Sequence, residues 1–429
     1  MVVVGGIVGS GIFATPSEVA QIVDTPALIL VAWVLGGALA LVGALCFAEL
    51  GARRPEAGGG YVYLRETFGP LWGFLYGWKL LLVSATGAIA ALAIIFARYF
   101  VDLVGMGEPW ISPIAVGALL FLSGINYLGV RFGSITQNIF TVLKMAALAL
   151  LIVVGLGWGA EMVDPEATSE VAGSGFTGIM AALGVALIPV LFSHGGWQHV
   201  NHIAGEIKKP GRNLPLSLLI GVGLVVGTYL LANTAYLYAL GVEGLAASTA
   251  PASDAVKNLW GATGGTIMSA GIVASVFGIL NLYIMAAPRV YQAMARDDLF
   301  FERFADLHPR YETPHRAILL QGGWAIILAL SGTFGQLLQY VVFGDWIFFA
   351  LVVATLFVYR RWDRAGRSKP GAETSFRMFG YPALPVLFIL ASGFVVVNSV
   401  YNEPLNALIG TVLIGAGVPA FLYWRSRNR

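Results

Sequence analysis

Two apolar segments of this chain are interrupted by glycine, one near the start and one near the middle. The first break, GSGIF, spans Gly9–Phe13, and the second, FSHGGW, spans Phe192–Trp197. Glycine loosens and uncovers a helical backbone, and uncovered backbone at membrane depth is tolerated only inside protein or beside a cavity. Breaks in corresponding halves of a membrane chain are typical of the binding site of a transporter. The alternative is that these glycines only let helices pack closely.

Composition predicts an all-α integral membrane protein. Hydrophobic residues make up 58% of the 429 residues and charged residues 11%, against about 25% charged residues in soluble domains. Twelve apolar stretches have lengths that approach or exceed the roughly 20 residues that a spanning helix needs. The predicted spans are 1–20, 26–50, 71–103, 111–129, 134–159, 176–204, 214–240, 264–292, 316–331, 335–359, 381–400 and 404–424.

The basic residues predict an orientation. With four exceptions, every Lys and Arg lies in, or at the edge of, the loops after the even-numbered spans or the C-terminal tail. The exceptions are Lys79, Arg98, Lys144 and Lys257. The opposite loops contain an acidic cluster of Glu161, Asp164, Glu166 and Glu170. The positive-inside rule therefore predicts that both termini are cytoplasmic. We interpret Lys79 and Arg98 as anchors at the membrane interface.

Lys144 is an ionisable residue about ten positions into the fifth span. Ten residues correspond to about 15 Å of helix, and a charge at such depth indicates function by default. The alternative is a lysine that snorkels to the interface. Asp345, beside Trp346 near the start of the tenth span, has no assigned role, since a carboxylate near a helix N-terminus needs none.

Other function classes find little support in the sequence. Cys46 is the single cysteine and lies within the second span, which rules out an internal disulfide and predicts no disulfide-linked heavy chain. The net charge is only +2, and the basic clusters suit anionic lipid rather than nucleic acid. The sequence has no nucleophile–base pair, P-loop or dinucleotide fingerprint, so we predict neither an enzyme nor a cofactor.

The two breaks resemble signatures of the amino acid–polyamine–organocation superfamily. Gly5–Phe13 is similar to its first-helix motif, and Phe192–Trp197 to its sixth-helix motif, closest to the L-type amino acid transporters and their bacterial relatives. Further motifs follow in the superfamily's order. They are AEL at 48–50, GGGY at 58–61, FLYGW at 74–78, RNLP at 212–215, SVFG at 275–278 and PRVYQAMARD at 288–297.

The resemblance implies a five-plus-five inverted repeat of the LeuT type with two further helices and with helices 1 and 6 broken. The first repeat would cover 1–160, the second 175–360, and the last two helices and the tail 378–429. Substrate would lie between the breaks. Amide donors after the first break suit a carboxylate, and carbonyl acceptors at the second suit an ammonium group. The expected substrate-binding residues are Val8, Gly9, Ser10, Gly11, Ile12, Phe192, Ser193, His194 and Gly195.

The resemblance also implies roles for single residues. Phe192 would be an aromatic gate over the substrate. Lys144 would replace the sodium ion of sodium-coupled relatives, with its ammonium near the Val8 and Gly9 carbonyls and the Ser275 hydroxyl. His194 stands where L-type transporters usually have tyrosine, so it either reshapes the pocket and titrates or only bonds a neighbouring carbonyl.

We therefore expect secondary active transport of neutral L-amino acids across a bacterial inner membrane by alternating access. Exchange and proton symport both remain open, so protons are a candidate partner. A cationic amino acid or polyamine antiporter is an alternative, disfavoured because no acidic residue lies at either break. A metal carrier is suggested by His199, His202 and Glu206 at helical spacing, but further ligands would be needed. A sensor that binds without transporting is the last alternative.

Overall fold

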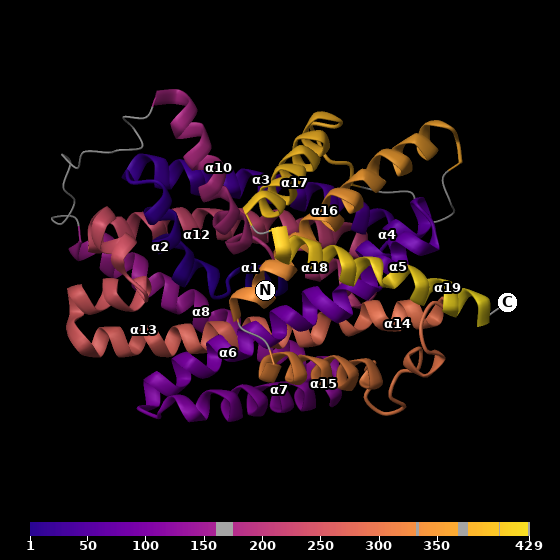
Figure 1. Cartoon of the computed structure of the whole chain (residues 1–429), viewed down its shortest axis with the longest axis horizontal. Helices are drawn as coiled ribbons and strands as arrows, with labels where there is room; N and C mark the ends of the chain where they lie inside the picture. Colours follow the sequence, from indigo (N-terminus) through magenta and orange to yellow (C-terminus); the bar gives the residue numbers. More distant parts are fainter. Residues whose placement is uncertain (160–174, 332–333, 368–375, 403, 428–429) are drawn as a thin grey trace.

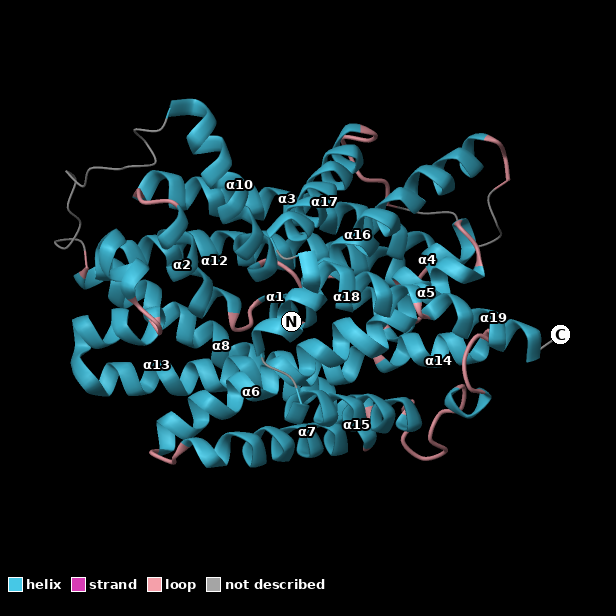
Figure 2. Ribbon diagram, in the orientation of Figure 1, coloured by secondary structure: helices cyan, strands magenta, loops and turns pink. Residues whose placement is uncertain are grey.

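The computed structural model describes residues 1–159, 175–331, 334–367, 376–402 and 404–427, and over these the secondary structure is helical, without strands. Most long helices run along the longest axis of the molecule (Figures 1 and 2). The first half contains α1 (Val2–Ile7), α2 (Gly11–Ile22), α3 (Pro26–Arg53), α4 (Gly60–Thr67), α5 (Pro70–Lys79), η1 (Leu80–Ser84), α6 (Ala85–Val104), η2 (Glu108–Trp110), α7 (Ile111–Tyr127) and α8 (Val130–Trp158). The second half contains α10 (Gly175–Ser193), α11 (His199–His202), η4 (Ala204–Glu206), α12 (Pro210–Ala247), α13 (Pro251–Ala286), α14 (Pro288–Arg296), η5 (Glu302–Phe304), α15 (His315–Ser331), α16 (Phe334–Arg364), α17 (Ala383–Asn402), α18 (Pro404–Gly415) and α19 (Gly417–Arg427).

Ten helical segments of the described residues are long and apolar enough to cross a membrane. The prediction of an all-α membrane protein is therefore confirmed at this level. Two of the twelve predicted spans do not meet the length criterion. The first is divided between α1 and α2, and the ninth corresponds to α15, which has 17 residues.

Local sequence signals explain where several helices begin. Proline stands at the start of α3, α5, α12, α13 and α14, where its missing N–H costs nothing and its fixed φ favours the helix. At α3 the Thr25 hydroxyl also accepts a 3.3 Å hydrogen bond from the Leu28 amide, which is an ordinary N-cap.

The two longest helices are each divided by one glycine. Gly241 in α12 has φ 66° and Gly261 in α13 has φ 73°, a left-handed conformation that favours glycine. These positions lie close to the predicted end of the seventh span and the predicted start of the eighth. The glycines therefore separate the spanning part of each helix from a short helical cap.

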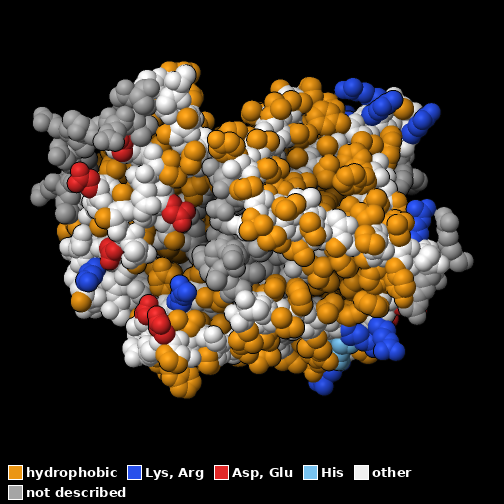
Figure 3. All heavy atoms as spheres, viewed as in Figure 1, with side chains coloured by type: hydrophobic (Ala, Val, Ile, Leu, Met, Phe, Trp, Pro, Cys, Tyr) orange, Lys and Arg blue, Asp and Glu red, His pale blue; other side chains and the backbone are white. Residues whose placement is uncertain are grey.

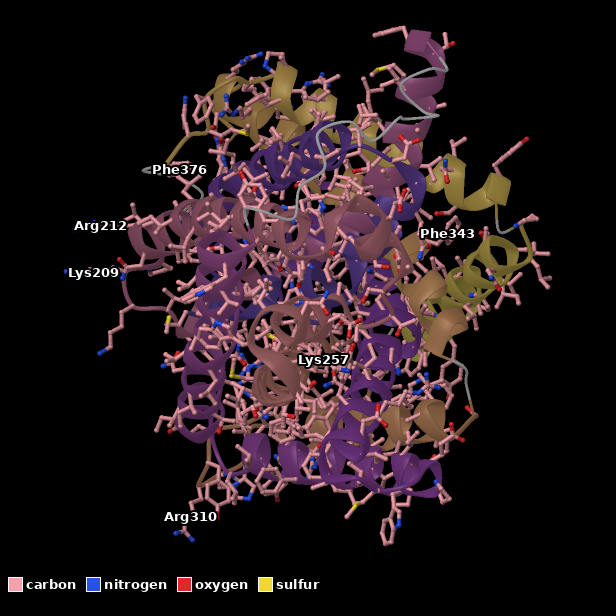
Figure 4. The ribbon with its side chains drawn as sticks, turned by 90° about the vertical axis from the view of Figure 1, so that its left-hand side faces the viewer. Lys209, Arg212, Lys257, Arg310, Phe343 and Phe376 are labelled. Atoms are coloured by element: carbon pink, nitrogen blue, oxygen red, sulfur yellow. The ribbon has the colours of Figure 1, made fainter. Side chains whose placement is uncertain are left out.

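The charged side chains divide the surface into two ends. In Figure 3 most visible Lys and Arg side chains lie toward the right and the Asp and Glu side chains toward the left. We call the right-hand end in Figure 1, which contains α4 with Arg65 and α14 with Arg296, the basic end, and the left-hand end, which contains α2 with Glu18, the acidic end. Figure 4, seen from the acidic end, shows Lys257 near the middle and Lys209, Arg212 and Arg310 at the margin.

A buried carboxylate ties α3 to α16 near the basic end. Glu49 is fully buried and accepts hydrogen bonds from Arg53 at 2.7 Å, from Arg360 at 2.6 Å and from the Met378 amide at 2.9 Å. Arg53 also pairs with Asp363 at 2.9 Å. Because a buried charge is tolerated only when its bonds are satisfied, this network fixes the two helices and the segment after α16 in one arrangement.

We expect Glu49→Gln to destabilise the protein, because the guanidinium groups of Arg53 and Arg360 would lose the buried anion that they share. The cost should be about 3–5 kcal/mol, seen as an apparent melting temperature of the detergent-purified protein lower by about 5 °C or more. Glu243→Gln is the matched control, because Glu243 is exposed at the end of α12. Equal melting temperatures for the two variants would contradict the structural role of Glu49.

Candidate functional site

The first break lies between α1 and α2. The helix α1 ends at Ile7, Val8 has an extended backbone (φ −71°, ψ 96°), and α2 begins at Gly11 with Ser10 before it. The first amides of a helix have no acceptor within it, and the helix dipole makes this end positive. The break therefore presents hydrogen-bond donors in the interior of the molecule, as the sequence predicts.

The second break lies between α10 and α11. The helix α10 ends at Ser193, and the short α11 begins at His199. Between them the Gly195 amide donates a 3.1 Å hydrogen bond to the Phe192 carbonyl, and Gly196 has φ 106°. Trp197 is buried against Phe47 and Phe349 with ring centroids 4.8 and 5.8 Å away, so its side chain holds this loop in place.

The two breaks contact each other directly through their backbones. A Cβ atom on Gly196 would overlap the carbonyl oxygen of Gly6, and one on Gly11 would lie 2.6 Å from Ser193 Oγ. The Tyr229 hydroxyl of α12 joins them further, because it lies 3.1 Å from the Ile7 carbonyl and 3.3 Å from the Ser193 carbonyl. Glycine at these positions is thus required by close approach, as well as by helix breaking.

Lys144 binds the C-terminal end of α1. Its side chain is fully buried, and Nζ donates to the carbonyls of Gly5 at 3.0 Å and Val8 at 2.6 Å. The Ser275 hydroxyl donates to the next carbonyl, that of Gly9, at 3.3 Å. The cation therefore meets the negative end of a helix dipole. It lies too deep to reach an interface, so the snorkelling alternative does not describe it.

A small cavity of about 80 Å³ lies between the breaks. Its walls come from both breaks and from α6, α13 and α16. Among the predicted substrate-binding residues, those that line it are Gly9, Ser10, Gly11, Phe192, Ser193 and Gly195. The Ser193 hydroxyl is buried without a hydrogen-bond partner among the described residues, so a polar atom is available in the wall.

Three predicted residues lie behind this wall. Val8 and Ile12 are fully buried and do not line the cavity. His194 is turned into the protein, where Nδ1 lies 2.9 Å from the Val190 carbonyl and its ring packs between Trp33 at 5.4 Å and Tyr229 at 5.1 Å. The simpler alternative for His194, a bond to a neighbouring carbonyl, is the one that the structure shows.

Phe192 lies between the central cavity and a second cavity of about 440 Å³ toward the acidic end, together with Ser10, Gly11 and Ile95. Charged residues line this second cavity, namely Glu18, Arg98 and Asp102. Phe192 lines both cavities. The role of Phe192 as a gate stays a prediction.

Ion pairs lie on the other side, between the helices at the basic end. Arg65 and the Tyr61 hydroxyl bind Asp297, and Arg289 Nε lies 2.9 Å from Glu206. They border a cavity of about 880 Å³. Glu206 lies outside α11 and pairs with Arg289, so it does not join His199 and His202 on one helix face as the spacing suggested.

The sequence analysis did not identify the part of the cavity wall that α13 and α16 form. Asp345, Trp346 and Phe349 of α16 and Tyr283 of α13 line it. The prediction for Lys79 was wrong, because Lys79 is 1% exposed and forms an ion pair with Asp345 instead of anchoring at an interface. The signal was present, since each is a lone charge in an apolar span, but linear sequence does not reveal that two such charges face each other.

We expect Gly196→Ala to disturb the contact between the breaks, because a Cβ would be strained at φ 106° and overlap the Gly6 carbonyl. The cost should be about 2 kcal/mol or more, measured as a lower melting temperature of purified protein. Gly223→Ala is the control, because Gly223 is an exposed helical glycine with open space around it. A Gly196→Ala protein as stable as this control would contradict the close approach.

Comparisons with known proteins show the family. A family model described as amino acid permease matches residues 1–421. The serine/threonine exchanger SteT of Bacillus subtilis is 33% identical over 430 residues, covering 99% of this chain and 95% of the relative. The large neutral amino acids transporter small subunit 2 of Homo sapiens is 30% identical over 100% of this chain and 80% of the relative, and the human b(0,+)-type amino acid transporter 1 is 32% identical over 94% and 81%. The resemblance seen in the motifs is confirmed, and the chain belongs to the amino acid permease family.

Proposed function

We propose that this protein is a secondary transporter that exchanges small neutral L-amino acids by alternating access. The observation that carries the proposal is the facing pair of helix breaks, which encloses a small cavity deep in an apolar bundle. The relatives support the substrate class, because their names describe exchange or transport of serine, threonine and large neutral amino acids.

The cavity wall suits a zwitterion. The amides at the start of α2 that border the cavity, those of Ser10 and Gly11, would bind the substrate carboxylate, as helix N-termini bind anions. Carbonyls at the second break would accept from its ammonium group. Those of Phe192 and Ser193 already accept one hydrogen bond each, but a carbonyl oxygen has two lone pairs. The unpartnered Ser193 hydroxyl would complete this side.

The size of the cavity favours small side chains. About 80 Å³ lies between the breaks, bordered by Trp346 and Phe349, so serine, threonine and alanine fit better than aromatic amino acids. Val8, Ile12 and His194 would then shape the site from behind the wall. The alternative of a cationic amino acid or polyamine antiporter would need an acidic residue at the site. Asp345 lines the cavity, but its carboxylate is already neutralised by Lys79.

The packing of the helices supports the inverted repeat. When spans 1–5 exchange with spans 6–10, three of the contacts between different spans are matched by a counterpart in the other half. The pairs are α2 on α12 with α10 on α3, α7 on α13 with α15 on α6, and α8 on α13 with α16 on α6. We therefore infer twelve spans, with repeats over 1–160 and 175–360 and a C-terminal pair over 378–429. Within these ranges, residues 160, 332–333, 403 and 428–429 lie outside those described.

The charge distribution supports an orientation. We infer that the basic end is cytoplasmic, by the positive-inside rule, in the inner membrane of a bacterium. The acidic cluster from Glu161 to Glu170 lies outside the described residues. Cys46 is fully buried in α3, which supports a carrier that works without a disulfide-linked heavy chain. Access would alternate between the Phe192 side and the side closed by the Asp297 and Glu206 ion pairs.

Lys144 would act as a fixed cation in this cycle. Its two carbonyl bonds hold α1 in the position that a bound sodium ion would otherwise require, and Ser275 adds a third bond. A permanently bound cation needs no ion gradient and so favours exchange. Proton symport, in which Lys144 would release a proton, is the competing mechanism.

We expect labelled serine to enter proteoliposomes preloaded with unlabelled serine, and to enter empty vesicles at least about tenfold more slowly even under an inward proton gradient. The reason is that Lys144 stays charged and supplies no proton coupling, so the carrier returns across the membrane only with a second amino acid bound. Protein-free vesicles are the control. Equal gradient-driven uptake into empty vesicles would establish symport, and uptake into neither would refute the proposed function.

Lys144→Met should abolish most exchange, because the Gly5 and Val8 carbonyls would lose a charged donor worth about 1.5–3 kcal/mol each. We expect preloaded-vesicle uptake of serine to fall at least about tenfold. Lys257→Met, which removes an exposed lysine at the acidic end, should leave uptake near that of the unmodified protein. Normal exchange by Lys144→Met would show that this cation is dispensable.

A further inference from the structure

We propose that the buried Lys79–Asp345 ion pair determines charge selectivity, by cancelling an acidic group in the wall of the substrate cavity and so excluding substrates with cationic side chains. The proposal rests on the proposed function, because it concerns which amino acids the same cavity accepts. Neither residue lies at a helix break, and neither belongs to the predicted binding set.

Asp345 is the charged residue among those that line the central cavity. It lies in α16 beside Trp346, which lines the cavity too, and its side chain is 18% exposed. Asp345 is thus partly exposed and belongs to the wall of the cavity that the two breaks enclose. A carboxylate at this place is within reach of the side chain of a bound amino acid.

Lys79 approaches the same carboxylate from the side away from the cavity. It does not line the cavity, it is 1% exposed, and its Nζ bonds Asp345 Oδ1. The rings of Tyr76 and Phe348 lie 5.2 and 5.4 Å from Nζ, so the cation is held by one anion and two aromatic faces.

The backbone around Lys79 is specialised for this placement. The π-helical segment η1 begins directly after Lys79, and such segments are rare and occur frequently at functional sites. The extra residue in this turn changes the direction in which the end of α5 presents its side chains relative to α6. A lysine here is directed to α16 rather than to lipid.

The electrostatic consequence follows from charge balance. A zwitterionic substrate carries no net charge, and a wall with a neutral ion pair suits it. With Lys79 removed, the wall would carry a net negative charge in a poorly screened interior, where opposite charges attract strongly. Asp345 would then attract a cationic side chain, and specificity is such a difference between competing substrates.

The test compares Lys79→Gln with the double variant Lys79→Gln/Asp345→Asn in proteoliposomes. The readout is inhibition of labelled serine uptake by lysine and by alanine. Lys79→Gln should increase the potency of lysine relative to alanine at least about tenfold. The double variant should return this ratio to that of the unmodified protein, since both charges are gone. An unchanged ratio in Lys79→Gln, or a ratio that stays raised in the double variant, would overturn the proposal.

Two controls separate this inference from the proposed function and from misfolding. If the unmodified protein takes up no serine, the proposed function fails, whereas uptake with an unaltered lysine ratio refutes only the role of the ion pair. If Lys79→Gln is not monodisperse, Asp345→Asn gives the opposite test. Its unpaired Lys79 should make aspartate inhibit serine uptake at least about tenfold more strongly relative to alanine, and an unchanged aspartate ratio would overturn the proposal.

Discussion

The bond between one buried ammonium group and the end of one short helix supports the rest of the site. The six residues of α1 form too short a helix to be stable alone, and its end lies in an apolar bundle with carbonyls that have no helical partner. Carbonyls from Gly5 to Gly9 accept hydrogen bonds from Lys144 of α8, Tyr229 of α12 and Ser275 of α13. Three helices from different parts of the chain thus place α1, and α1 places the cavity.

Backbone groups at helix ends also explain how an interior with few charges could bind a zwitterion. Backbone amides and carbonyls at helix breaks carry partial charges in fixed positions, so the proposed substrate site needs few ionised side chains. The ionised groups that are present near the site are satisfied by a helix end, as for Lys144, or by each other, as for Lys79 and Asp345. Each arrangement keeps the cost of a buried charge low without leaving a net charge in the cavity.

Much of this could be predicted from the sequence because glycine breaks and lone charges stand out against an apolar background. The two breaks and the depth of Lys144 were visible in this way. The partner of Lys79 was not, because Asp345 is 266 positions away and only the packing of α16 on η1 and α6 brings the two together. For His194 the sequence did not reveal the direction of the side chain, since Ser193 and Gly195 on either side of it line the cavity whereas His194 is turned toward the Val190 carbonyl. Gly278 shows the same limit. A Cβ there would lie 2.6 Å from Phe140 Cβ and 3.4 Å from Lys144 Nζ, a requirement that only the helix packing reveals.

The Tyr229 hydroxyl has one proton and two acceptors, the carbonyls of Ile7 and Ser193, which belong to different breaks. It can therefore satisfy either carbonyl fully, while the other keeps only a weakened share. When one broken helix moves away from the other, the hydroxyl loses little, because the remaining carbonyl takes the whole bond. Tyr229 can thus join the two helix breaks and still keep one full hydrogen bond when they move apart.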